Sequence, residues 1–171
     1  MGEIQYETAS LGAVHGSDLA SDDCRAVYCY KVVYGLCRDA RAFDVLKTLG
    51  DSWEGTATTT PAEPGKSGAR IVLSMQIASS GHTLVHEGHA AEYDPMKNPG
   101  QKDNPFTMIV IDGDLLELTH YCDADNRPRM IGKLLPDGKT IDFESLDVSG
   151  NPQYGHMQHV KFTVVDSDHH T

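Results

Sequence analysis

Histidine is the residue type in this chain whose number and spacing suggest chemistry. The 171 residues include nine histidines, and imidazole is the side chain whose ordinary pKa lies closest to neutral pH. Two of them fall in runs that alternate like β-strands: His120 shares a face with Leu118, and His156 shares a face with Val160 and Phe162. Because the apolar face of a strand is usually buried, both imidazoles are predicted to point into the interior.

An inward imidazole has two interpretations, and the sequence leaves both open. In the first, His120 and His156 line a pocket, together with Tyr121 or Arg129, and fix the orientation of a bound molecule. In the second, they are core histidines whose ring nitrogens bond to the backbone or to each other. A histidine acting as the general base of an isomerase or hydrolase, and a haem held by His156, are further alternatives to simple binding.

The remaining histidines give weaker indications of a metal or catalytic site. On a strand, His82 and His86 share a face while His89 lies on the other, so these three cannot converge on a metal without help from another element. The segment from His86 to His89 is one residue too short for the zinc motif His-Glu-x-x-His, and it reads as strand rather than helix. Because the sequence also lacks a nucleophile motif and a phosphate loop, we expect no metal site and assign no catalytic residue. His169 and His170 are expected to fray.

Composition narrows the function classes. The formal net charge is −11 and the pI is about 5.1, so the surface should repel nucleic acid. Neither a membrane role nor secretion is expected, because no apolar run approaches about 20 residues and Met1–Gln5 has no basic start of a signal peptide. We therefore expect a cytoplasmic protein with reduced thiols; Cys24, Cys29 and Cys37 are spaced poorly for zinc.

Hydrophobic periodicity predicts one short helix followed by seven or eight strands. The helix spans Arg38–Leu49, where apolar residues recur at helical spacing. Asp112-Gly113 and Asp137-Gly138 are hairpin signals between apolar runs. This pattern indicates an all-β protein, an antiparallel up-and-down barrel or a sandwich, in residues 41–171, with residues 1–40 as a poorly specified extension. The expected strands are Ser52–Thr60, Ile71–Ile77, His82–Glu92, Phe106–Ile111, Leu115–Cys122, Arg129–Leu134, Thr140–Leu146 and His156–Val165.

Three blocks of sequence carry a family resemblance. They are Phe43–Leu49 leading to Trp53-Glu54-Gly55, then Thr119–Cys122 with Asn126–Met130, and finally Gly155–Met157 with Lys161–Thr163 and Asp166–His169. In this order they resemble a lipocalin-like, calycin-superfamily family of mostly bacterial proteins of unknown function. The resemblance covers residues 43–171. One departure is Asp51, which stands where the Gly-x-Trp opening of lipocalins has glycine.

With His120 and His156 as polar contacts, the barrel is expected to bind a small, largely apolar ligand without a cofactor. The resemblance itself implies a small lipocalin-like barrel with an apolar interior, closed at one end by the helix, and no agreed activity. It also implies that Trp53 packs across the barrel floor against the helix and that Arg129 stacks on it. Family members continue beyond the last block, so the barrel is expected to be incomplete at its C-terminus. An open edge at His156–Val165 would then invite a homodimer.

Overall fold

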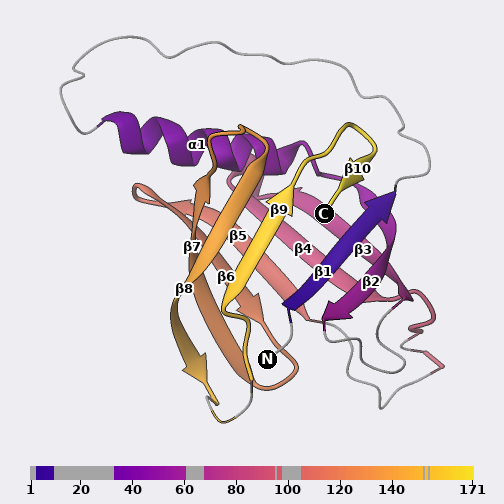
Figure 1. The fold of residues 1–171 in the computed structure, drawn as a ribbon. Helices are drawn as coiled ribbons and strands as arrows, with labels where there is room; N and C mark the ends of the chain where they lie inside the picture. The colour runs from indigo at the N-terminus through magenta and orange to yellow at the C-terminus, as the bar shows by residue number, and fades with distance from the viewer. Residues whose placement is uncertain are drawn as a thin grey trace.

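The chain folds into one curled antiparallel sheet with a helix across one end (Figure 1). The computed structural model describes residues 3–9, 33–60, 68–94, 96–97, 105–151, 153 and 155–171. Within these residues the strand order is β10-β1-β2-β3-β4-β5-β6-β7-β8-β9. The elements are β1 (Glu3–Ala9), α1 (Val33–Lys47), β2 (Ser52–Thr60), β3 (Ala69–Ala78), the short 3₁₀ turn η1 (Ser79–Gly81), β4 (Thr83–Ala90), β5 (Phe106–Asp112), β6 (Leu115–Tyr121), β7 (Asn126–Leu134), β8 (Thr140–Gly150), β9 (His159–Thr163) and β10 (His169–His170).

The predicted fold class is confirmed: the structure is all-β, antiparallel and up-and-down, with one α-helix in the described residues. Each strand from β2 to β8 pairs with the next one in the sequence, so the sandwich alternative does not apply. The helix begins at Val33, earlier than the predicted Arg38. No helix among the described residues is long and apolar enough to cross a membrane.

Strand β1 was not predicted. It pairs with β2 along its whole length, from Glu3 opposite Thr60 to Ala9 opposite Glu54. Residues 1–40 therefore contribute a strand to the sheet, and the predicted boundary after residue 40 does not separate an extension from the barrel. The sequence did hold a signal, since Ile4, Tyr6 and Thr8 alternate with acidic or amide residues.

The two ends of the sheet meet through β10. His170 pairs with Thr8 of β1 and forms a bridge to Val164, just after β9. The backbone N–H of Thr163 donates to the carbonyl of Thr171, and the reverse bond is also present, at 2.7 and 3.0 Å. The predicted open edge is therefore wrong for Thr163 and Val164, whose backbone groups pair with the C-terminal residues. The expectation that His170 frays is also wrong, because its backbone pairs with Thr8.

Helix α1 buries its apolar stripe on the inner surface of β5, β6 and β7. Its buried residues are Ala42, Phe43 and Leu46, followed by Leu49 just past its end. Just past the helix, the indole Nε1–H of Trp53 donates to the Leu49 carbonyl at 2.9 Å. Leu49 lies two residues beyond the helix, and its carbonyl also accepts the backbone N–H of Asp51 at 2.8 Å. Trp53 is buried in the same core cluster as the helix residues Ala42, Phe43 and Leu46.

Beneath the helix, the interior is filled by apolar side chains in register. Leu84, Ile109, Leu118 and Met130 occupy facing positions on four successive strands and are almost completely buried. Gly132 makes room for the neighbouring Phe143: a Cβ there would lie 2.5 Å from the phenyl ring. The end of the barrel nearest the helix is therefore closely packed.

Candidate functional site

A row of polar side chains crosses the inner face of the sheet beside this apolar layer. His86 of β4 lies opposite Thr107 of β5, and Thr107 lies opposite His120 of β6. The three residues, called here the inner polar row, alternate along their strands with the same phase as Leu84, Ile109 and Leu118. Thr107 Oγ1 is 2.8 Å from His120 Nδ1, so the two side chains share a hydrogen bond.

Aromatic rings from the other end of the sheet face this row. The Phe162 ring of β9 lies edge-on to the His86 ring, with centroids 5.6 Å apart. Phe162 also packs edge-on against Phe143, at 6.0 Å. Side chains of β4 and β9 therefore meet across the interior. The rings of Phe162 and Phe143 form an apolar surface opposite the inner polar row.

A third interior histidine comes from the short strand β10. His170 is only 3 % exposed, and its ring lies edge-on to Trp53 with centroids 4.4 Å apart. It lies near enough to His86 for its positive charge to lower the pKa of His86.

Burial keeps these imidazoles neutral. Desolvation, followed by the proximity of His170 and His120, lowers the pKa of His86 to about 4. Desolvation also lowers the pKa of His170 to about 4. The pKa of His120 is lowered by desolvation, against a smaller opposing effect of Asp123. At neutral pH each ring is therefore uncharged, with one protonated and one unprotonated nitrogen.

The inner polar row also retains accessible surface. His86 and His120 are half-buried, although desolvation is the main reason for their lowered pKa values. The row thus combines an inward position with side-chain surface that stays accessible.

Asn126, at the start of β7, is the other buried polar group of the inner face. It is 1 % exposed and alternates in phase with Met130. Its amide Nδ2 donates to the Gly155 carbonyl at 3.4 Å. Its Oδ1 is the one buried side-chain oxygen or nitrogen, among the described residues, without a hydrogen-bond partner.

Of the residues predicted to line a pocket, His120 lies on the inner face as expected, and Trp53 is buried beside His170. His156 lies in the segment before β9, which begins at His159, so strand alternation does not extend to it. Tyr121 follows His120 and so lies on the opposite face, where its ring stacks on Phe106 with centroids 4.5 Å apart. The structure does not bring these two residues to the inner polar row.

Arg129 lies on the outer face, and the expected stacking on Trp53 is wrong. Its guanidinium makes two hydrogen bonds to Asp147 of β8 and lies 3.7 Å from Glu117. Pro128 and Met130, on either side of Arg129 in β7, are buried. Because successive side chains of a strand point to opposite faces, Arg129 points outward. The ring beside Trp53 is that of His170.

The expected absence of a metal site remains a prediction, although in the described part of the chain no three His, Cys, Asp or Glu side chains are grouped closely enough to hold a metal ion. His86 points inward while His89 bonds to its neighbour's carbonyl, so the two diverge as predicted. The haem alternative assumed that His156 is an inward-facing strand residue. Because β9 begins only at His159, the structure gives no support to that assumption. Cys24 and Cys29, and the side chain of Cys37, lie outside the described residues.

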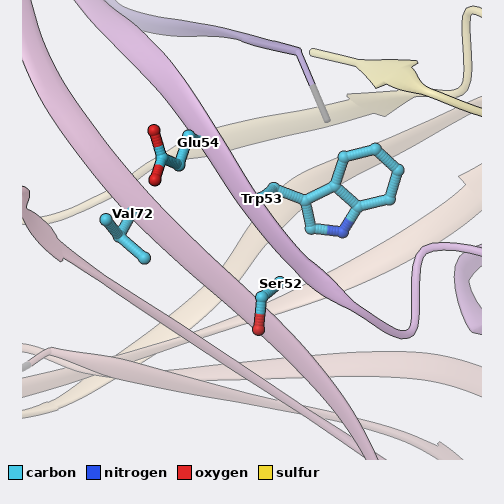
Figure 2. A pocket seen from close by; sticks show the side chains of 4 residues that line it. All are labelled: Ser52, Trp53, Glu54 and Val72. Carbon is cyan, nitrogen blue, oxygen red and sulfur yellow. The ribbon is translucent and has the colours of Figure 1, made fainter. Parts of the chain in front are cut away.

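A small hollow of about 220 Å³ on the outer surface is lined by Ser52, Trp53, Glu54 and Val72. Figure 2 shows the indole of Trp53 on the opposite side of β2 from Glu54 and Val72. Ser52 and Glu54 are exposed, and Glu54 pairs with Arg70 at 2.9 Å. This hollow therefore lies outside the sheet and is separate from the inner polar row.

Sequence reasoning did not select His86, Thr107, His170 or Asn126, but two of them carried a signal. The alternation that placed His120 inside applies equally to His86, which follows Leu84 by two residues. The Asp112-Gly113 hairpin fixes the register that puts Thr107 opposite His120. Only the closed sheet brings His170 to Trp53.

Comparisons with known proteins add no assignment. A scan against protein-family models found no match to this chain. Searches of the curated proteins and of the solved structures also found none. The lipocalin-like resemblance therefore stays a hypothesis, and the chain's own geometry carries the functional argument.

Proposed function

We propose that this protein binds a small, largely apolar ligand inside its curled sheet, with His86, Thr107 and His120 as polar contacts. The observation that carries the proposal is the inner polar row, which is inward, neutral and half-buried and faces the apolar ring of Phe162. Binding sites for small molecules commonly combine an apolar lining with a few polar groups that fix orientation. The resemblance to lipocalin-like barrels favours the same conclusion.

A binding role accounts for these histidines better than a catalytic one. A general base works best when its pKa lies near the working pH, whereas the pKa of His86 is about 4 and that of His120 is also lowered. Such imidazoles bind protons poorly at neutral pH, yet they still donate and accept hydrogen bonds. We therefore favour binding over the histidine-dependent isomerase or hydrolase.

The test combines calorimetry with nuclear magnetic resonance. Wild-type protein is titrated with 1-octanol, indole and indene, and the ring Cε1–Hε1 signals are assigned with His→Gln variants. We expect at least one probe to bind and to shift the signals of His86 and His120. His82, which is exposed, and His89 are the internal controls, and their signals should stay in place.

Two results would contradict the proposal. One is that none of the three probes binds at its solubility limit. The other is that a bound probe shifts the signals of His82 or His89 and leaves those of His86 and His120 unchanged, which would place the binding site on the outer face.

A further inference from the structure

We infer that the open edge of β9 binds an extended peptide as an added β-strand, with an acidic residue of the peptide opposite Lys161. The added strand runs antiparallel to β9 and continues the line of β10. This surface lies on the edge of the sheet, so it goes beyond the proposed binding of a small molecule inside the sheet and does not depend on it.

Strand β10 shows how a strand fits at this edge. It runs antiparallel to β1, with His170 opposite Thr8, and antiparallel to the end of β9, through the bridge from His170 to Val164. Strands β1 and β9 therefore run in the same direction on the two sides of β10 (Figure 1), two strand spacings or roughly 10 Å apart. Past β10, within the described part of the chain, residues 3–7 of β1 and 159–161 of β9 pair with no strand on this side.

The backbone of β9 presents hydrogen-bonding groups along this edge. In an antiparallel pair, successive residues of one strand point their N–H and C=O groups alternately toward and away from the partner strand. The Val164 N–H donates to the residue just before β8, whereas Thr163 exchanges two bonds with Thr171 on the other side. By the same alternation, the backbone groups of Lys161 and His159 point away from β8. Both residues are exposed, so a peptide backbone can reach them.

The pair formed by Thr163 and Thr171 sets the register of an added strand. Continuing from this pair, the first peptide residue lies opposite Phe162, the second opposite Lys161 and the third opposite Val160. Phe162 is buried, and the half-buried Val160 packs against the same core. The first and third peptide residues therefore share the inner face and should be apolar, while the second lies on the outer face beside Lys161.

Charge favours an acidic residue at the second position of the peptide. Lys161 is exposed, and it forms no ion pair with any other residue that the structure describes. Its neighbour on β8 is Asp142, but that carboxylate lies 2.5 Å from the ring of His159. Because opposite charges on facing strands stabilise the pairing, a glutamate or aspartate is the best partner for Lys161.

The same rule disfavours a second copy of β9 at this edge. Two β9 strands related by a twofold axis, in the registers that use the free backbone groups, place Lys161 opposite either Lys161 or His159 of the other copy. Neither partner is acidic, and facing lysines repel each other. A peptide of the alternating apolar and acidic type avoids this repulsion, which is why we assign the edge to a peptide partner.

Two capped peptides test this surface by nuclear magnetic resonance titration of the whole protein: acetyl-Val-Glu-Val-Thr-amide and acetyl-Val-Lys-Val-Thr-amide. We expect the glutamate peptide to shift the backbone amide signals of His159 and Lys161. It should bind roughly twofold to tenfold more tightly than the lysine peptide, as expected for a cross-strand charge pair. The amide of Val160 points toward β8 and should shift less.

Reversing one charge tests the register. Lys161→Glu should reverse the preference, so that the lysine peptide binds more tightly. Lys133→Glu is the matched control, because Lys133 is exposed on β7 and pairs with Glu144. It changes the net charge of the protein by the same amount and should keep the preference for the glutamate peptide.

Removing one backbone donor tests the strand pairing itself. Lys161→Pro lacks the N–H that points away from β8, a position where an edge strand tolerates proline, and it should lose most of the affinity for both peptides. Lys161→Ala keeps that N–H and should bind the two peptides about equally. The Ala and Glu variants keep the inference testable if Lys161→Pro fails to fold.

Three results would overturn the inference. The first is that neither peptide shifts the amides of His159 and Lys161 up to its solubility limit. The second is that Lys161→Glu leaves the preference for the glutamate peptide unchanged. The third is that raising the concentration of the protein alone shifts the same amides, which would mean that a second copy occupies the edge.

Discussion

His170 lies edge-on to Trp53, with ring centroids 4.4 Å apart and an interplanar angle of 81°. This contact joins the short strand that links the two ends of the sheet to the buried tryptophan of β2, whose indole N–H donates to Leu49 just past helix α1.

Replacing His170 by Ala should destabilise the protein by about 1–3 kcal/mol, because it removes a buried ring from its contact with Trp53. Urea unfolding measures the loss. Trp53 is the single tryptophan, so its fluorescence should also shift to longer wavelength as the indole becomes more hydrated. His169→Ala is the matched control: its ring is half exposed, and the change should stay within about 0.5 kcal/mol. Equal effects of the two substitutions would contradict a special role for His170.

Acidification should destabilise the fold between about pH 6.5 and pH 4. The pKa values of His86 and His170 are about 4 in the folded state and 6.5 in the unfolded chain. In that window the unfolded state binds more protons, so stability is complete above pH 6.5 and falls as the pH decreases. The two histidines each contribute up to about 3 kcal/mol over this range.

The measurement is the urea midpoint at several pH values between 7 and 4. His86→Gln cannot take up a proton and should flatten the pH dependence, while His82→Gln, at an exposed position, should leave it unchanged. The pKa values of Asp137 and Asp147 are lowered by hydrogen bonds from Thr140 and Arg129 respectively. Protonation of these two carboxylates, at and below the ordinary pKa range of aspartate, removes the bonds and further destabilises the fold at lower pH. A profile that His86→Gln does not alter would contradict the interior placement of His86.

Gly132→Ala should destabilise by about 1–3 kcal/mol through overpacking. The added Cβ would lie 2.5 Å from Phe143 and 2.9 Å from Leu116. Gly155→Ala is the control, because a Cβ there meets nothing within 4 Å. Thermal or urea unfolding compares them, and Phe143→Leu combined with Gly132→Ala should recover part of the loss by making room. If the double variant is no more stable than the sum of the single changes predicts, overpacking against Phe143 is not the cause.

Thr107→Val should cost about 0.5–2 kcal/mol, because it removes the hydroxyl that bonds to His120 Nδ1 and keeps the shape of the side chain. Long-range ¹H–¹⁵N spectra of the imidazole should also show a changed Nδ1 signal for His120. Thr119→Val, on the outer face next to His120, is the comparison. Its hydroxyl makes only a long bond of 3.4 Å to Glu117, so a smaller effect is expected. An unchanged His120 signal in Thr107→Val would show that the bond does not persist in solution.

Local sequence patterns were sufficient for most of the fold. Strands β2 to β8 were predicted because apolar alternation and turns such as Asp112-Gly113 act between near neighbours. The same local rule placed His120 on the inner face. It failed for His156, because alternation continues only as far as the strand itself, and β9 begins three residues later.

What the sequence determined by itself was therefore the fold class, the helix, and which face of each predicted strand is apolar. The tertiary structure decided which distant segments meet: β1 with β2, His170 with Trp53, and Phe162 with His86. These contacts join residues far apart in the chain, and their register depends on how the whole sheet twists and curls. The pairing of Arg129 with Asp147 and the unpartnered oxygen of Asn126 have the same origin, since a side chain's partner is set by the neighbouring strand and not by its own.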